Sequence, residues 1–189
     1  MTRTIAVICG TSDQQTMRVA AQLATQLQQQ GNQIEIYEAG NLSESFQPRT
    51  FDGVIVGAAM EGGEFPMKVN RVIRQLRADL HEMPSAFFSI MSSGDDEQKM
   101  RGHNEAFSER TQWYPVVMAA FVDVDNGASR GMIERMDVGA IGRRRLGEID
   151  YDRDYGRAGG SDVGDLIEQF NDHIQHAEDH PEMPTRPGM

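Results

Sequence analysis

The sequence has one cysteine, Cys9, so no disulfide can form within the chain. It has no apolar run that approaches the roughly 20 residues of a membrane span, and no basic segment followed by an apolar signal core at its start. We therefore expect a cytoplasmic protein without a transmembrane segment. Because Cys9 lies in an apolar run, we expect a buried thiol. A reactive thiol is the alternative, since a nearby helix start lowers thiol pKa values.

Basic residues are also scarce: the 189 residues include 18 Lys and Arg against 29 Asp and Glu, which gives a net charge of −11. Nucleic acids and anionic lipids both attract cationic surfaces, so neither is an expected partner. Lys68 and Lys99 are the only lysines. An acidic, lysine-poor surface suits a solvent of high salt, where charge repulsion is screened, and this is the basis for a halophilic hypothesis.

Several catalytic and metal-binding motifs are missing, namely HExxH, CxxC, a Walker motif and a Ser-His-Asp order. Hydrolase and metalloenzyme functions therefore have little support. His173, His176 and His180 cluster near the end of the sequence. A metal site needs a third ligand and a buried setting, so we interpret these histidines as an exposed helix face and predict no metal site.

What the chain does contain is an alternation of short apolar strands and amphipathic helices. Strands are expected at residues 5–10, 33–37, 51–57, 84–91 and 115–123, and helices at 14–30, 65–80, 97–111 and 161–176. This alternation predicts an α/β protein whose parallel sheet has helices on both sides. We expect one domain over residues 1–178 and a flexible tail over 179–189. The domain includes an irregular insertion at 125–160, with a short helix around 131–141.

Apolar residues at helical spacing predict the face that each helix buries. These stripes are Val19, Leu23 and Leu27, then Val69, Val72, Ile73 and Leu76, and finally Val163, Leu166, Ile167, Phe170 and Ile174. Trp113 and Tyr114 precede the fifth strand, at the amino edge of the sheet, so we expect them in the core or at an interface.

Three loops are predicted to meet at the carboxyl edge of the sheet, where open α/β sheets bind ligands. They are residues 11–16, 58–64 and 92–96, and each is rich in small or hydroxyl residues and contains no Lys or Arg. A phosphate held there is bound by neutral donors and by the positive end of a helix. Such a site suits the phosphate monoester of a cofactor better than a nucleoside triphosphate, which requires Lys and Mg²⁺. Helix capping alone is the alternative explanation for the hydroxyls at 11–16.

The first loop, Thr11-Ser-Asp-Gln-Gln-Thr16, resembles the Ser/Thr-x-Thr-Gly-x-Thr phosphate loop of the flavodoxin-like FMN-binding family. The resemblance implies a flavodoxin-like three-layer α/β/α sandwich with a five-stranded parallel sheet of order 2-1-3-4-5, and FMN as cofactor. It also implies that the first loop holds the phosphate and that the second and third loops contact the flavin ring. The cofactor-binding residues implied in this way are Thr11, Ser12, Asp13, Gln14, Gln15, Thr16, Ala59, Met60, Glu61, Gly62, Gly63, Met91, Ser92, Ser93, Gly94 and Asp95.

Within this family the chain looks most similar to the menaquinone-dependent protoporphyrinogen oxidase branch. The similarity rests on Asp13 and Gln15, on the strand Pro84-Ser-Ala-Phe87, and on the pair Gln112-Trp113. It implies an FMN-dependent oxidoreductase that uses a redox partner protein or a quinone, although no catalytic residue can be named. An electron carrier without its own substrate is one alternative. Since Gln14 stands where the family prefers Gly, a fold that has lost FMN is another. The unassigned region 125–160 leaves a homodimer open.

Overall fold

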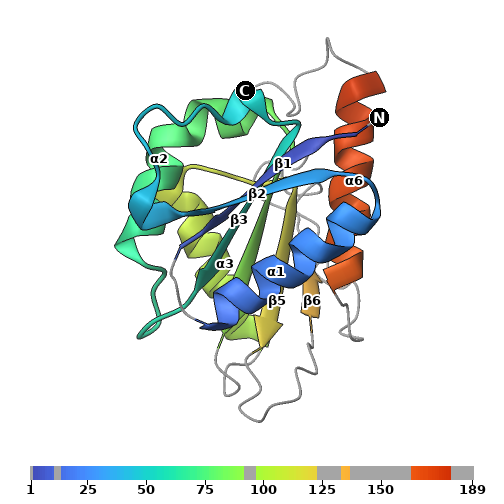
Figure 1. Ribbon diagram of the computed structural model, residues 1–189. Coiled ribbons are helices and arrows are strands. Elements are labelled where there is room, and N and C mark those ends of the chain that lie inside the picture. The colour runs from blue at the N-terminus through green and yellow to red at the C-terminus, as the bar shows by residue number, and fades with distance from the viewer. Residues whose placement is uncertain (1, 11–13, 92–96, 123–132, 137–162, 180–189) are drawn as a thin grey trace.

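The computed structural model describes residues 2–10, 14–91, 97–122, 133–136 and 163–179, and these are built around one six-stranded sheet. Five strands are parallel and follow the order β2-β1-β3-β4-β5, which confirms the predicted sheet (Figure 1). They are β1 (Thr4–Cys9), β2 (Gln33–Glu38), β3 (Gly53–Ala59), β4 (Ser85–Met91) and β5 (Val117–Val122). Helices separate most of these strands along the chain, as parallel pairing requires.

A sixth strand, β6 (Ile133–Met136), extends the sheet beyond β5 and runs antiparallel to it. The prediction of a short helix around residues 131–141 is therefore wrong at these four positions. Ile133 and Met136 are three residues apart, which is a helical spacing, but pairing with the open edge of β5 determines the conformation. The rest of the predicted insertion, and the tail beyond Asp179, lie outside the described residues.

Four helices and two short 3₁₀ turns complete the described fold. Helices α1 (Gln14–Gln29) and α6 (Val163–Asp179) pack on one face of the sheet, and α2 (Met67–Glu82) and α3 (Glu97–Thr111) pack on the other (Figure 1). The 3₁₀ turns η1 (Ala39–Asn41) and η2 (Pro48–Thr50) lie between β2 and β3. The three-layer α/β/α architecture is thus confirmed.

The core beneath α2 and α3 is rich in aromatic rings. The stripe Val69, Val72, Ile73 and Leu76 is buried there as predicted. Phe87 stacks on Phe107, with ring centroids 4.6 Å apart, and meets Trp113 edge-on at 6.0 Å. Trp113 is fully buried, and its indole N–H donates to the Ser85 hydroxyl at 3.1 Å. This confirms the core position of Trp113, and the hydrogen bond satisfies its one polar atom.

The core on the opposite face joins β1 to α1 and α6. Alternate residues of β1, including Ile5 and Cys9, point into it and are fully buried, which confirms the buried thiol. Leu23 and Leu27 of α1 are also fully buried, whereas Val19 is only half-buried. The predicted stripe of α6 is buried along its whole length. Both faces of the central strands are therefore covered, as expected for a parallel sheet.

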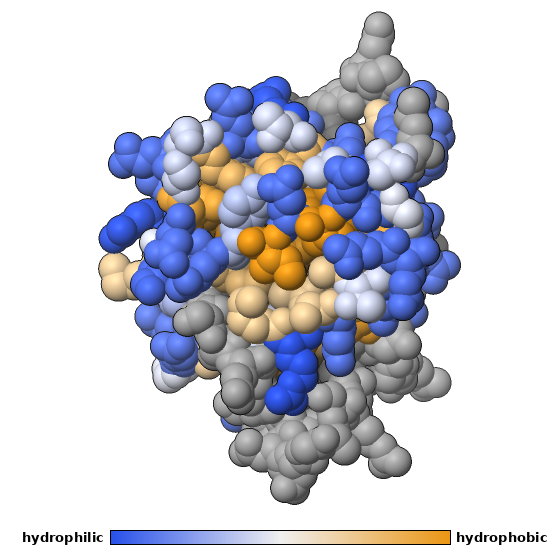
Figure 2. All heavy atoms as spheres, in the orientation of Figure 1, coloured by the Kyte–Doolittle hydropathy of each residue, from blue (hydrophilic) through white to orange (hydrophobic). Residues whose placement is uncertain are grey.

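The surface in Figure 2 is mainly hydrophilic around a smaller hydrophobic area, where β2 and α1 lie in Figure 1. Strand β2 forms one edge of the sheet, and its Ile36 is 41% exposed. None of the described helices is both long and apolar enough to cross a membrane.

Candidate functional site

The carboxyl ends of β1, β3 and β4 lie side by side at one edge of the sheet. Cys9 is paired with Gly57, and Ala59 is paired with Ile90, so the three strands end at similar heights. The chain leaves β1 for β2 on one side and returns to β3 on the other, so the strand order reverses between β1 and β3. Such a reversal point is where open α/β sheets bind their ligands.

The first loop joins β1 to the start of α1 and begins with a closely packed glycine. Gly10 N donates to the Gly57 carbonyl oxygen at 2.6 Å. A Cβ at Gly10 would lie 2.1 Å from Cγ2 of Val69, so a larger residue would push α2 away from the end of β1. Gly10 and Gly57 were not among the predicted site residues. The signal that could have identified them is a glycine at or just after a strand end.

The predicted phosphate-binding residues are only partly described. Thr11, Ser12 and Asp13 lie outside the described residues, as do the side chains of Gln14 and Gln15. Both glutamines belong to the first turn of α1, so their backbone lies at the positive end of that helix. Thr16, in the first turn of α1, is fully buried.

The second loop forms an ordered hairpin turn. Glu61 N donates to Glu64 O at 2.9 Å, and Glu64 N donates to Glu61 O at 3.2 Å. The central residues Gly62 and Gly63 have φ values of 61° and 86°, the pattern of a type I′ turn, which glycine adopts without strain. All four residues are exposed. The turn is tied to the sheet through Met60 N, which donates to Ile90 O at 2.9 Å.

No other atom lies within 4 Å of a Cβ built at Gly62 or Gly63. The side-chain-free face of the turn is therefore open, and a planar group could approach its backbone closely. Met60 is half-buried and packs against the aromatic core beneath α2. The structure thus brings Ala59, Met60 and the glycine turn together at the strand edge that also carries the first loop.

The third loop follows β4. Backbone pairing of Met91 with Val122 places the end of β4 at the same edge. The side chain of Met91 and the residues Ser92, Ser93, Gly94 and Asp95 lie outside the described residues, so their contacts stay predictions.

Few charges surround this edge in the described part of the chain. Glu61 and Glu64 are the carboxylates of the turn, and Arg110 Nη2 approaches Glu64 Oε1 at 3.7 Å. No group of three or more His, Cys, Asp or Glu among the described residues could hold a metal ion. His173 and His176 lie on α6, and His180 lies outside the described residues.

Comparison with known proteins gives a consistent picture. A family model described as "Flavodoxin domain" matches residues 6–130. Protoporphyrinogen IX dehydrogenase [quinone] of Escherichia coli K12 is 25% identical over 113 residues, which is 58% of this chain and 62% of that enzyme. The chain therefore covers less than two thirds of the curated relatives that it matches.

Similar solved structures include two flavodoxins. That of Megasphaera elsdenii aligns with a TM-score of 0.51 and 17% identity, over 65% of this chain and 90% of its own. A cysteine mutant of the Pseudomonas aeruginosa flavodoxin aligns with a TM-score of 0.50 and 16% identity, over 67% of this chain and 88% of its own. Rubredoxin oxygen:oxidoreductase of Desulfovibrio gigas aligns with a TM-score of 0.56 and 10% identity, over 95% of this chain and 37% of its own. These likenesses establish the fold.

Proposed function

Because this chain belongs to the flavodoxin domain family, we propose that it is a redox protein that binds FMN non-covalently at the carboxyl ends of β1, β3 and β4. The observation that carries the proposal is the juxtaposition of these strand ends at the point where strand order reverses. It is the position at which flavodoxin-like sheets hold FMN.

The donor set fits this cofactor. A hydroxyl-rich loop precedes α1, so hydroxyls, backbone N–H groups and the helix dipole can together hold a doubly charged phosphate without a lysine. The open glycine face of the Glu61–Glu64 turn fits a flat ring, since no side chain blocks it. The two carboxylates of the turn are exposed, so water screens them from the phosphate end.

In this proposal Thr11, Ser12, Gln15 and Thr16 hold the phosphate. The Met60–Gly63 and Ser92–Asp95 segments contact the ring from the second and third loops. FMN supplies the electron-transfer chemistry when it is bound, and the protein binds, orients and electrostatically tunes it.

The direct test is a titration of FMN with purified protein, followed by flavin fluorescence. Binding against a protein surface is expected to quench the fluorescence and to shift the flavin absorption bands. Riboflavin, which lacks the phosphate, is the matched control ligand and is expected to bind more weakly. Unquenched fluorescence at high protein concentration would instead favour the alternative that the fold has lost FMN, to which Gln14 points.

A second candidate function is the oxidation of protoporphyrinogen IX with a quinone as electron acceptor. The observation that favours it is the 25% identity to the Escherichia coli enzyme. The resemblance of Asp13 and Gln15 to the phosphate loop of the protoporphyrinogen oxidase branch points the same way. The test is turnover of protoporphyrinogen by the FMN-loaded protein with a menaquinone analogue. Flavin reduction by an electron-transfer partner without substrate turnover would favour the electron-carrier alternative. A cytoplasmic location, a single domain over residues 1–178 and a homodimer stay predictions.

A further inference from the structure

The first three turns of α2 carry an unusual concentration of positive charge. Between residues 65 and 78 lie four of the 18 basic residues of the chain, Lys68, Arg71, Arg74 and Arg77, and none of its 29 acidic residues. All four are exposed. The rest of the chain is correspondingly more acidic than its net charge of −11 indicates.

Local helix energetics do not favour the first of these cations, Lys68. The N-terminus of a helix is its positive end, so acidic residues stabilise the first turn and basic residues oppose it. Helix α2 has no acidic residue in its first turn and has Lys68 at its second position. Within the described part of the chain, Lys68, Arg71 and Arg77 make no ion pair. The charge of Lys68 therefore does not stabilise the helix end, and such a local conflict is expected at a functional site.

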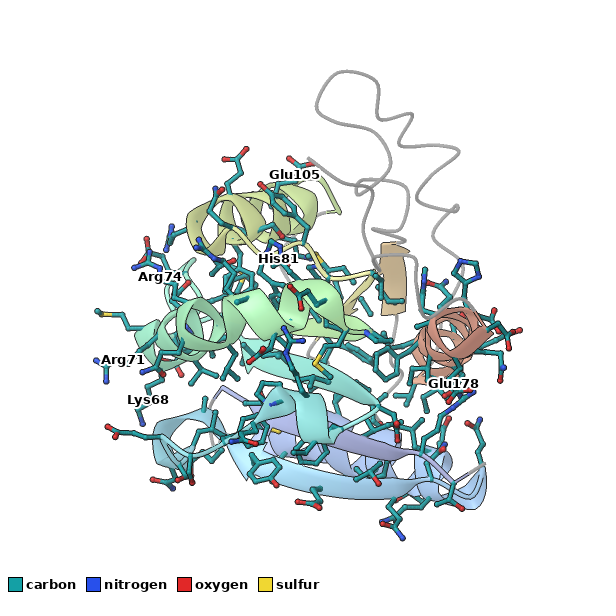
Figure 3. The ribbon with its side chains drawn as sticks, turned by 90° about the horizontal axis from the view of Figure 1, so that it is seen from above. Lys68, Arg71, Arg74, His81, Glu105 and Glu178 are labelled. Atoms are coloured by element: carbon teal, nitrogen blue, oxygen red, sulfur yellow. The ribbon has the colours of Figure 1, made fainter. Side chains whose placement is uncertain are left out.

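Two of these arginines line a groove between α2 and α3. The groove has a volume of about 490 Å³ and is lined by Met67, Asn70, Arg71, Arg74, Gln75 and Arg110. In Figure 3, Arg71 and Arg74 extend outward from α2 on the side of the molecule that also presents Lys68. No carboxylate belongs to the lining.

Polar contacts hold the walls of the groove, and its Arg71 makes no ion pair within the described residues. Arg74 Nη2 donates to the Arg110 carbonyl oxygen at 3.5 Å, which links the two helices. Asn70 Nδ2 donates to the Phe65 carbonyl oxygen at 3.2 Å and fixes the start of α2. Met67 is 82% exposed at the mouth and offers an apolar contact. The groove adjoins the Glu61–Glu64 turn, because Arg110 also reaches Glu64.

We propose that this groove docks an acidic polypeptide segment of a partner protein. Guanidinium groups bind carboxylates through paired N–H donors, so a groove lined by three arginines suits a chain that presents several carboxylates. The rest of the protein carries a net negative charge and repels an acidic segment, so such a segment is directed to this groove. An anionic membrane fits less well, because Met67 is the one exposed large hydrophobic residue that the described part of α2 and α3 offers for insertion.

The test uses a fluorescently labelled peptide of consecutive glutamates and a glutamine peptide of the same length. Fluorescence anisotropy is measured in low salt, where screening is weakest. The intact protein is expected to bind the glutamate peptide and not the glutamine peptide. Arg71→Gln combined with Arg74→Gln is expected to weaken binding about five- to tenfold, since two exposed ion pairs are lost.

The matched control combines Arg18→Gln with Arg49→Gln, two arginines that belong neither to the groove nor to the cationic face of α2. It removes the same charge from exposed arginines outside the groove, and it is expected to change binding less than about twofold. Equal weakening by both pairs of substitutions would overturn the proposal, because it would indicate general electrostatics. Failure of the intact protein to bind in low salt would also overturn it, as would tighter binding to phosphatidylserine vesicles than to the peptide. Thermal melts of all variants verify that they fold.

Discussion

Gly63 has a φ of 86°, and no other atom lies within 4 Å of a Cβ built on it. A substitution at Gly63 therefore introduces backbone strain without a steric clash. Gly63→Ala is expected to destabilise the protein by about 1 kcal/mol, because alanine disfavours this left-handed conformation. If the turn contacts FMN, the same substitution is also expected to weaken FMN binding by several fold. Urea unfolding and FMN fluorescence titration measure the two effects.

Gly31 provides the control for this prediction. It has a φ of 88°, equally open surroundings, and a position just beyond the end of α1, at the other edge of the sheet. Gly31→Ala is expected to cost about the same stability, roughly 1 kcal/mol, and to leave FMN binding unchanged. If both variants lowered FMN affinity equally, the effect would come from stability rather than from the turn.

Glu61 is the exposed carboxylate at the base of the same turn. A negative charge near a flavin disfavours its anionic reduced form, so Glu61→Gln is expected to raise the midpoint potential of bound FMN. The expected size is on the order of 20 mV, since water screens an exposed charge strongly. Glu82→Gln, at the far end of α2, removes the same charge and is expected to leave the potential unchanged. A reductive titration with reference dyes measures the midpoint potential of bound FMN in the original protein and in both variants. An unchanged or lower potential in Glu61→Gln would show that this carboxylate does not tune the flavin.

At the residue scale, apolar periodicity predicted which helix residues are buried, but it did not predict individual hydrogen bonds or backbone angles. The stripes of α2 and α6 are buried as expected because three- and four-residue spacing places them on one helix face. The hydrogen bond from Trp113 to Ser85 could not be predicted, since it joins residues 28 positions apart. The positive φ of Gln112, 57°, also had no signal in the sequence. Both depend on how α3 returns to the sheet.

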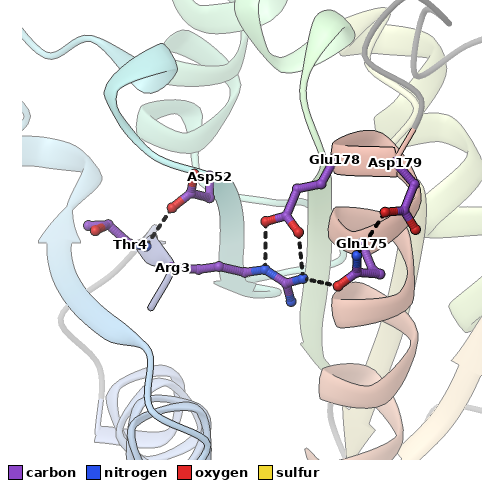
Figure 4. Close-up of polar contacts among 6 residues, drawn as sticks. All are labelled: Arg3, Thr4, Asp52, Gln175, Glu178 and Asp179. Carbon is purple, nitrogen blue, oxygen red and sulfur yellow. Dashed lines mark hydrogen bonds and ion pairs between the residues drawn. The ribbon is translucent and has the colours of Figure 1, made fainter. Parts of the chain in front are cut away.

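At the element scale, α6 is tied to the start of β1 by one side chain. Arg3 Nε donates to Glu178 Oε1 at 2.9 Å, and Arg3 Nη2 donates to Glu178 Oε2 at 2.9 Å and to Gln175 Oε1 at 2.7 Å (Figure 4). Nearby, Thr4 N donates to Asp52 Oδ2 at 2.7 Å. The paired N–H donors of the guanidinium match the two carboxylate oxygens, which makes this contact specific in direction.

The contact predicts a pH dependence of stability. Hydrogen bonding to Arg3, supported by its charge, lowers the pKa of Glu178 below the ordinary value. The stabilisation is therefore fully present above the unfolded pKa of glutamate, about 4.3, and is lost as the pH falls through the lower folded value. Glu178→Gln is expected to cost less than about 1 kcal/mol at neutral pH, because the pair is partly exposed to solvent.

Urea unfolding at neutral and acid pH provides the measurement. The difference in unfolding free energy between the original protein and Glu178→Gln is expected to shrink as the pH falls. Glu168→Gln removes a charge from the same helix and serves as control, since the exposed Glu168 makes no ion pair in the described part of the chain. A difference that persisted unchanged into acid would show that the Glu178 carboxylate is not the source.

The ends of the predicted strands and helices lie within three residues of those observed, whereas β6 was missed. Four residues are too few to distinguish helical from strand spacing, and the decisive factor is the free edge of β5. The family resemblance implied that the second loop, which contains the turn at Glu61–Glu64, contacts the flavin ring. The structure shows its type I′ form, and the ring contact stays a proposal.

For the whole molecule, the order of elements predicted a parallel sheet with helices on both sides, and the family resemblance implied its strand order, which the structure confirms for β1 to β5. Parallel strands with intervening helices leave few arrangements, and the strand ends then place the three loops together. The details of the site could not be predicted in the same way. Gly10 and Gly57 approach Val69 and Phe88 closely, and these contacts could not be predicted because Val69 and Phe88 belong to other elements of the fold.

The net charge of −11 predicts that the stability of the whole molecule depends on salt. Repulsion among the carboxylates acts over the Debye length, which falls from about 10 Å at 0.1 M to about 3 Å at 1 M salt. Raising KCl between these concentrations is therefore expected to raise Tm by about 3 to 8 °C. Sucrose controls for general solvent exclusion.

A charge variant separates screening from other effects of salt. Glu44→Lys combined with Glu168→Lys changes two exposed acidic residues that make no ion pair in the described part of the chain. The variant carries less negative charge, so it is expected to be more stable than the original protein in dilute buffer and to gain less from KCl. Differential scanning calorimetry of both proteins across the salt series measures this. A Tm that is the same in dilute buffer and in molar KCl would refute the halophilic hypothesis. It would show that repulsion among the surface carboxylates is too weak to lower the stability of the protein.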